Sequence, residues 1–333
     1  MRAIVCKEMG PPRSLRLAEI PSPEPGSGEV LIRVEGAGVN FPDSLIIEGK
    51  YQVKPALPFV PGFEVAGTVL EIGRGVTSFK PGDRIMSLTA NTVGGFAEEA
   101  IVTAEQAVVI PGVMDGITAA AFYSSYGTSY HALVERGHLR QGETLVVLGA
   151  AGGIGLATIE IGKALGARVI AVASTKEKLD VAKAHGADEL VNYRSEDLAR
   201  RIKQLTDGKG ADVCMDTVGG DAFDSMSRNM NYNGRLLIVG FASGTIPRLA
   251  VNLLLLKGYQ AVGVFWGPAV ARDPEKHREN FRRLGKLYAE GKLNPRMSGV
   301  YPLERTAEAI EALLSRRETG KLVVSPLESD GSR

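Results

Sequence analysis

The sequence has few cysteines, almost no net charge and no long apolar run. Cys6 and Cys214 are the only cysteines among 333 residues, and both lie in strand-like apolar runs, which predicts buried thiols rather than a disulfide. The 39 Lys and Arg residues balance 38 Asp and Glu residues, so charge does not favour nucleic acid or an anionic membrane as a partner. No apolar stretch approaches the roughly 20 residues that span a bilayer, and the N-terminal MRAIVCKEMG lacks the apolar core of a signal peptide. We therefore expect a cytoplasmic globular protein that acts on a small molecule.

Residues that bind zinc are also scarce. The four histidines, at positions 131, 138, 185 and 277, show no ligand spacing with either cysteine. We therefore expect no Cys/His metal site.

The sequence pattern changes from strands alone to strands that alternate with helices. Up to about residue 123, short β-type runs such as EVLIRVEGAGV and EVAGTVLEIG lie between Gly- and Pro-rich turns, as in a small all-β barrel. Helical segments then separate most of six apolar runs, which cover 144–148, 168–172, 189–192, 212–216, 235–239 and 260–264. This alternation predicts parallel crossovers and a doubly wound, six-stranded sheet, so the fold class is α/β.

The C-terminal part is too short for a third domain. It contains two helical patterns, HRENFRRLGKLYAEGKL and ERTAEAIEALLSRRETG, and a last strand, KLVVSP. We expect it to complete the first domain. The predicted domains are therefore residues 1–124 with 266–333, and residues 125–265.

The motif LGAAGGIG, which starts at position 148, predicts a phosphate-binding loop. Gly149, Gly152 and Gly155 have the spacing G-x-x-G-x-x-G, and Gly153 and Ile154 complete the loop. Such glycines let a strand turn sharply into a helix whose free N–H groups and partial positive charge bind a pyrophosphate. Its position between a strand and a helix favours dinucleotide binding over an ordinary tight turn.

The end of the second strand of this sheet favours NADPH over NADH. An enzyme that uses NADH usually has an acidic residue there for the ribose 2′-hydroxyl, and this chain has Ser174 and Thr175. With Lys178 they offer donors to a 2′-phosphate, whereas Glu177 would have to point elsewhere. The alternative is that these residues only cap a helix and form its solvated face.

Four stretches of the chain resemble one known family. The stretches VNFPDSLIIEGKYQVKPALPFVPGFEVAGTV, LGAAGGIG, VNYRSEDL and TGKLVVSP are similar to the zinc-independent quinone oxidoreductase branch of the medium-chain dehydrogenase/reductase superfamily. The resemblance implies a GroES-like β-barrel catalytic domain, a Rossmann domain, NADPH in the cleft between them and a homodimer. It also implies hydride transfer to a quinone or an α,β-unsaturated carbonyl compound.

The zinc-dependent members of this superfamily differ at two motifs. Where they have a Cys, this chain has Asn40-Phe41-Pro42-Asp43, and Phe63 stands at the His of their Gly-His-Glu motif. Their four-cysteine lobe is absent from this sequence. Because no set of three ligands remains, we expect a metal-free site.

Without a metal, the substrate needs another hydrogen-bond donor or proton source. Asn40 can donate from its amide, and Tyr51 has a phenolic hydroxyl. The resemblance implies that Asn40 lies near the nicotinamide ribose and that Tyr51 lines the pocket, either as proton donor or only as a wall. Asp43 either orients these two side chains or is a turn residue that follows Pro42.

The resemblance and the strand ends supply further cofactor-binding candidates. These are Thr128, Tyr193, Thr217, Gly240, Phe241, Ser243, Phe265, Trp266 and Lys321. Lys321 either reaches a phosphate or is a solvated lysine.

The sequence leaves two alternative functions open. A 2-enoyl-thioester reductase and a cofactor-binding protein without strong catalysis are the alternatives to a quinone or enone reductase.

The run Ala261–Val264 is a candidate edge strand. Pairing with a second copy of the chain would cover this edge, and this favours a homodimer.

Overall fold

The computed structural model describes residues 1–328, and the chain divides into two compact units. The first unit contains Met1–Ser124, Ala269–Arg282 and the segment that begins at Arg296. The second contains Ser125–Pro268 and Arg283–Pro295. Residues 283–295 thus pack with the second unit, although the sequence pattern groups them with the C-terminal part of the chain.

The first unit is built on a seven-stranded sheet and a separate antiparallel pair of strands. The sheet order is β14-β15-β3-β4-β5-β7, and β6 pairs with β3. Its strands are β3 (Glu29–Val39), β4 (Glu64–Ile72), β5 (Arg84–Leu88), β6 (Glu99–Thr103), β7 (Val108–Val109), β14 (Met297–Pro302) and β15 (Lys321–Ser325). The pair is β1 (Arg2–Val5) with β2 (Arg16–Glu19). In this order the strands do not close into a ring within the described residues, although the chain has the expected GroES-like α/β fold.

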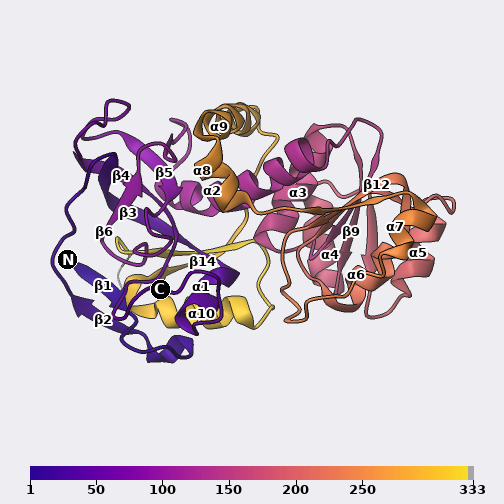
Figure 1. The fold of residues 1–333 in the computed structure, drawn as a ribbon, viewed down its shortest axis with the longest axis horizontal. Helices are drawn as coiled ribbons and strands as arrows, with labels where there is room; N and C mark the ends of the chain where they lie inside the picture. Colours follow the sequence, from indigo (N-terminus) through magenta and orange to yellow (C-terminus); the bar gives the residue numbers. More distant parts are fainter. Residues whose placement is uncertain (329–333) are drawn as a thin grey trace. The chain divides into compact units, whose positions relative to one another are not determined.

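Pairing in this sheet brings the two ends of the chain together. The C-terminal strands, yellow in Figure 1, lie among the N-terminal strands, and Leu322 of β15 pairs with Val39 of β3. On the other side of β3, Ala37 pairs with Val65 of β4. The residues that adjoin these pairs, Asn40 and Lys321, therefore lie close to the start of β4.

Helices and short 3-10 turns complete the first unit. They are η1 (Pro12–Ser14), α1 (Phe41–Ile47), η3 (Leu303–Arg305) and α10 (Thr306–Leu314). Two longer helices, α2 (Gly116–Tyr130) and α9 (Pro274–Ala289), contain residues of both units, and so does α8 (Trp266–Arg272). A π-helical turn, η2 (His131–Arg136), follows α2.

The second unit has the predicted parallel sheet of six strands. Their order is β10-β9-β8-β11-β12-β13, and every pairing is parallel. The strands are β8 (Thr144–Leu148), β9 (Arg168–Ala173), β10 (Glu189–Asn192), β11 (Ala211–Asp216), β12 (Met230–Ile238) and β13 (Gln260–Gly263). The helices are α3 (Gly153–Ala164), α4 (Lys176–Ala184), α5 (Leu198–Leu205), α6 (Gly220–Ser227) and α7 (Asn252–Lys257). Figure 1 shows β9 and β12 within the unit and the helices around them.

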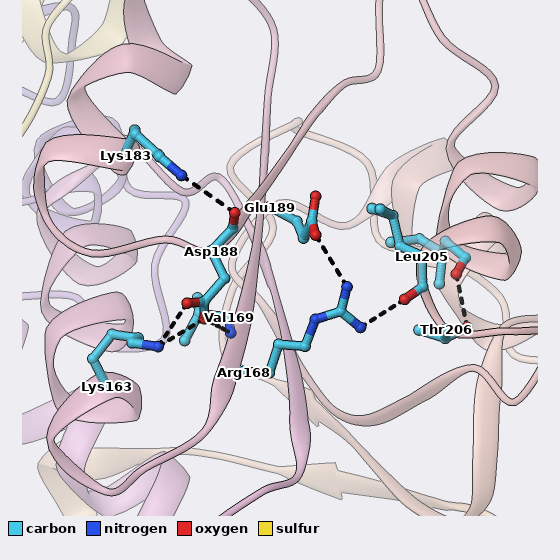
Figure 2. A network of polar contacts seen from close by, with 9 residues as sticks. Lys163, Arg168, Val169, Lys183, Asp188, Glu189, Leu205 and Thr206 are labelled. Atoms are coloured by element: carbon cyan, nitrogen blue, oxygen red, sulfur yellow. Dashed lines mark hydrogen bonds and ion pairs between the residues drawn. The ribbon is translucent and has the colours of Figure 1, made fainter.

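Ion pairs fix the amino edge of this sheet. Lys163 of α3 bonds both oxygens of Asp188 at 2.8 Å, and Asp188 also accepts from the Val169 backbone. Arg168, the first residue of β9, pairs with Glu189 of β10 at 3.1 Å (Figure 2). These contacts stabilise the edge opposite the loops that carry the predicted dinucleotide site.

No helix in the described chain combines the length and the apolar character that crossing a membrane requires.

Candidate functional site

The glycine loop joins the end of β8 to the start of α3. Gly149 has φ +69°, a left-handed conformation that favours glycine. A Cβ added at this position would lie 2.8 Å from the Thr217 hydroxyl oxygen. Gly152 is the N-cap of α3 and, being glycine, has no side chain that could cap the helix. A Cβ on Gly152 would meet only the Gly149 carbonyl oxygen, at 3.6 Å, among the described residues. Within the described residues the helix therefore begins without a cap from its N-cap side chain, behind an open surface, which fits an approaching phosphate.

Gly155 and Ile154 shape the loop from inside. A Cβ on Gly155 would lie 2.3 Å from the Gly149 carbonyl oxygen, so glycine alone permits this close approach of helix and turn. The Ile154 carbonyl accepts hydrogen bonds from the Ser129 hydroxyl at 3.1 Å and from the Thr158 hydroxyl at 2.7 Å. These contacts hold the first turn of α3 in place.

The loops after β11 and β12 lie beside the glycine loop. Thr217 donates from its hydroxyl to the Leu148 carbonyl at 3.1 Å, and the Ser243 backbone N–H donates to the Val218 carbonyl at 2.8 Å. A Cβ on Gly240 would contact the Thr217 carbonyl at 3.5 Å. Thr217, Gly240 and Ser243, predicted separately, thus come together at the carboxyl edge of the sheet, where this fold binds ligands.

Asp216, at the end of β11, is a buried carboxylate whose local role the sequence did not reveal. One oxygen accepts from the backbone N–H groups of Val218 and Gly219 at 2.8 and 2.9 Å, and burial raises its pKa. A Cβ on Gly219 would lie 3.1 Å from the Phe241 ring. Asp216 therefore fixes the turn against which Phe241 packs.

The residues predicted for the adenosine end lie at the neighbouring strand ends. Tyr193 follows β10, and its backbone N–H donates to the Ala173 carbonyl at 3.2 Å, immediately before Ser174. The Tyr193 side chain is exposed. Ser174 and Tyr193 are therefore brought together.

Thr175 also serves as a helix cap. Its hydroxyl oxygen accepts from the Lys178 backbone N–H at 3.4 Å at the start of α4. The Glu177 carboxylate bonds its own backbone N–H and the Thr175 hydroxyl, which lowers the Glu177 pKa. Thr175 therefore caps α4, and contact of Ser174, Thr175 and Lys178 with a phosphate stays a prediction.

The α2 helix brings Thr128 near the predicted aromatic residues. Trp266 packs against Gly127 so closely that a Cβ there would lie 2.3 Å from the indole ring. Thr128 and Trp266 are both buried, whereas Phe265 is 58% exposed. Trp266 therefore packs within the second unit, and contact of Thr128, Phe265 and Trp266 with the cofactor stays a prediction.

The first unit contains a buried polar cluster that joins three distant segments. Lys321 Nζ lies 2.7 Å from Glu64 Oε2, and both side chains are almost fully buried. Asn40 Nδ2 donates to the same Glu64 oxygen at 2.8 Å and to the Gly38 carbonyl at 2.9 Å. Lys321 Nζ also donates to Asn40 Oδ1, and the Ser124 backbone N–H donates to Glu64 Oε1. Glu64 and Lys321 are buried and Asn40 is partly buried, and we call these three residues the buried triad.

Lys321 and Asn40 differ from the predictions made for them from the sequence. Lys321 is not a solvated lysine, because only 6% of its surface is exposed and Glu64 neutralises it. Asn40 was expected to donate to a substrate, but both of its amide hydrogens are already used inside the unit.

Asp43 and Tyr51 lie beside the buried triad. Asp43 is fully buried, and its Oδ2 accepts from the Asn40 backbone N–H at 2.8 Å, which places it in the first turn of α1. Among the described residues its Oδ1 has no hydrogen-bond partner, and burial raises the pKa of Asp43 to about 7. Tyr51 is half-buried against the core, and its pKa is raised by burial and then by the charge of Asp43. Asp43 thus holds the backbone of Asn40 and acts electrostatically on Tyr51.

Glu64 is a site residue that the sequence did not single out. It directly follows Phe63, and in the structure its carboxylate is the acceptor that joins Asn40, Lys321 and Ser124. An acidic residue at the start of an apolar strand was the available signal. Among the described residues, no group of three His, Cys, Asp or Glu side chains is placed to hold a metal ion.

Family models match most of the chain. The model described as an alcohol dehydrogenase GroES-like domain matches residues 26–112, and the one described as a zinc-binding dehydrogenase matches residues 153–286. The quinone oxidoreductase-like protein 2 homolog of Nematostella vectensis is 39% identical over 326 residues, which cover 97% of this chain and 88% of the relative.

Solved structures agree with these matches. The Escherichia coli quinone oxidoreductase complexed with NADPH has a TM-score of 0.92 and 29% identity, over 98% of this chain and all of that one. A mycobacterial protein complexed with NADPH has a TM-score of 0.91 and 31% identity, with the same coverage. The likeness therefore extends over almost the whole length of both chains.

Proposed function

Because the chain belongs to the quinone oxidoreductase family of the medium-chain dehydrogenase/reductase superfamily, we propose that it is an NADPH-dependent reductase of quinones or α,β-unsaturated carbonyl compounds. The observation that carries this proposal is the glycine loop, with its open surface at Gly152 and uncapped helix start. Two similar structures are complexes with NADPH, which supports the same cofactor here.

Each group of residues has a distinct task in this proposal. The loop from Gly149 to Gly155 binds the pyrophosphate, and Ser174 and Lys178 bind the 2′-phosphate. The reduced nicotinamide supplies a hydride when it is bound. Tyr51 gives a proton to the reduced substrate, since its hydroxyl remains protonated at neutral pH and is half-buried. Asn40 orients a ligand.

The chemistry of the side chains supports a mechanism without zinc. Phe63 has no atom that can bind a metal and stands where the zinc-dependent relatives have a histidine. Glu64, the residue that follows it, is neutralised by Lys321. The polarising role therefore falls to hydrogen-bond donors of the protein.

We propose further that the protein is a homodimer joined along β13. This strand is the last in the sheet order, so among the described residues no further strand pairs with its outer side. In α7 nearby, Leu253 and Leu254 pack on the core, whereas Leu255 and Leu256 are 84% and 74% exposed. A second copy would cover both features, and sedimentation of the wild type as a monomer at micromolar concentration would contradict the proposal.

A panel of substrates tests the reductase function. The protein is mixed with NADPH, and absorbance at the nicotinamide band is followed with 1,4-benzoquinone, a small enone and crotonyl-CoA in turn. We expect oxidation of NADPH with benzoquinone or the enone, and a fall in kcat of at least about tenfold for Tyr51→Phe with the enone. Activity with crotonyl-CoA alone would favour an enoyl-thioester reductase. No oxidation with any substrate would leave only a cofactor-binding protein.

A further inference from the structure

The hydrogen bonds of the buried triad fix the orientation of one carboxamide. Asn40 donates one amide hydrogen to the Gly38 carbonyl and the other to Glu64 Oε2. Its oxygen accepts from the Lys321 ammonium group. A carboxamide has two N–H donors and one oxygen acceptor, so with both hydrogens used inside the unit Oδ1 is the only amide atom that can bond a ligand.

The opposite orientation of the amide would be unfavourable. It would turn the NH2 group toward the Lys321 ammonium and the oxygen toward the Glu64 carboxylate, and both contacts would repel. Without Lys321, Glu64 would still accept from the amide nitrogen of Asn40, but the amide oxygen would have no charged partner. Lys321, which is almost fully buried, adds the second constraint.

We propose that Lys321 is a positioning residue of the reductase site, which holds the Asn40 carboxamide so that Asn40 meets a ligand only as a hydrogen-bond acceptor. The ligand group that fits is an O–H or an N–H, and a carbonyl oxygen does not fit. The inference rests on the proposed function, because it assigns the reductase its means of orienting a ligand.

A substitution of Lys321 can lower activity in two ways, by destabilising the fold or by releasing the Asn40 carboxamide. Removing Lys321 alone leaves the Glu64 carboxylate buried without its cation, which destabilises a protein strongly. The double variant Lys321→Met/Glu64→Gln removes both charges and thus keeps the cluster neutral. Lys321→Arg keeps the charge, and Lys286→Met, at a lysine whose side chain is 79% exposed, controls for the substitution itself.

The decisive experiment is a double-mutant cycle between Lys321→Met and Asn40→Leu. The readouts are kcat and KM with benzoquinone or the enone, and the NADPH dissociation constant from fluorescence. If Lys321 acts through Asn40, each single variant lowers kcat at least about tenfold, and the double variant is no slower than the slower single one. Effects that multiply, or an unchanged kcat and dissociation constant in Lys321→Met, would overturn the proposal.

The neutral double variant provides a second test of the proposal. We expect Lys321→Met/Glu64→Gln to regain most of the unfolding midpoint lost in Lys321→Met while kcat stays low, and Lys321→Arg to restore part of kcat. Recovery of kcat together with stability would show that Lys321 only supports the fold, and would overturn its positioning role.

Failure of the reductase function would look different. In that case the wild type oxidises NADPH with none of the substrates, and the cycle is read in the NADPH dissociation constant alone. Non-additive changes there would still support the positioning of Asn40, and additive changes would overturn it.

Discussion

The two units present their candidate site residues by opposite physical means. In the second unit the predicted pyrophosphate site is made of backbone, with glycines at 149, 152 and 155 and an uncapped helix start. In the first unit the site is made of buried charged and polar side chains, and Lys321 and Glu64 form its ion pair. The first kind of site depends on close approach of backbone, and the second depends on charge balance.

This difference decides what each unit tolerates. A glycine loop fails when a single methyl group forces the backbone apart, whatever the charge nearby. A buried cluster fails when one charge loses its partner, even if the shape is kept. Substitutions of the two kinds should therefore affect different measured quantities.

The largest expected effect comes from Gly155→Ala. The new Cβ would lie 2.3 Å from the Gly149 carbonyl oxygen and 2.7 Å from the Ala150 carbonyl carbon, and both are backbone atoms that must move. We expect the NADPH dissociation constant to rise more than about 100-fold, or about 2.7 kcal/mol. Isothermal titration with NADPH measures it.

Gly152→Ala is the matched control in the same loop. Its Cβ would lie 3.6 Å from the Gly149 carbonyl oxygen, an ordinary contact, so we expect the free energy of unfolding to change by less than about 1 kcal/mol. NADPH affinity should nevertheless fall, because the methyl group occupies the open surface. Wild-type affinity in both variants would show that the pyrophosphate binds elsewhere.

The same contrast explains what the sequence could predict. The strand at 144–148, the loop motif and the helix after it are neighbours along the chain, so their pattern carries the physical requirement of the turn. The bonds of the buried triad join Asn40 to Glu64, 24 positions away, and to Lys321, 281 positions away. Those contacts arise from the pairing of β3 with β4 and β15, and periodicity does not specify that register.

A similar long-range contact explains why residues 283–295 pack with the second unit. The backbone N–H of Asn294 donates to the buried Glu160 of α3 at 2.9 Å, and the hydroxyl of Tyr126 donates to the same carboxylate at 2.6 Å. The sequence shows this segment only as the end of a helical pattern. The partner of its backbone lies in another part of the chain and leaves no local signal.

The next prediction tests charge balance in the first unit through pH. The folded pKa of Asp43 is about 7 and its ordinary value is 3.8, so the folded protein holds a proton that the unfolded chain has already lost between these values. Stability from this group is present at low pH and is lost as pH rises to about 7. Relative to the wild type, Asp43→Asn should gain about 2 kcal/mol in free energy of unfolding from pH 5 to pH 8, measured by urea denaturation.

Asp188→Asn in the second unit provides the control of opposite sign. Although burial raises the pKa of Asp188, its bonds with Lys163 and the Val169 N–H outweigh burial and lower it (Figure 2). The stabilising charge of Asp188 is therefore lost only at acidic pH. The difference in free energy of unfolding between Asp188→Asn and the wild type should stay constant from pH 5 to pH 8. If the free energy of unfolding of Asp43→Asn relative to the wild type is also constant from pH 5 to pH 8, the charge balance described for the first unit is contradicted.

The smallest expected effect tests whether the second unit uses backbone alone. If Lys178 pairs with the 2′-phosphate, Lys178→Ala should raise the dissociation constant of NADPH about tenfold, or about 1.4 kcal/mol, and leave that of NADH unchanged. Lys176→Ala, at an exposed lysine of the same helix that pairs with Asp180, controls for the loss of one surface charge. Titration of both cofactors into all three proteins measures the ratio. An unchanged NADPH constant in Lys178→Ala, or equal affinity of the wild type for NADH, would mean that the site binds both dinucleotides through the glycine loop, without a contribution from the 2′-phosphate.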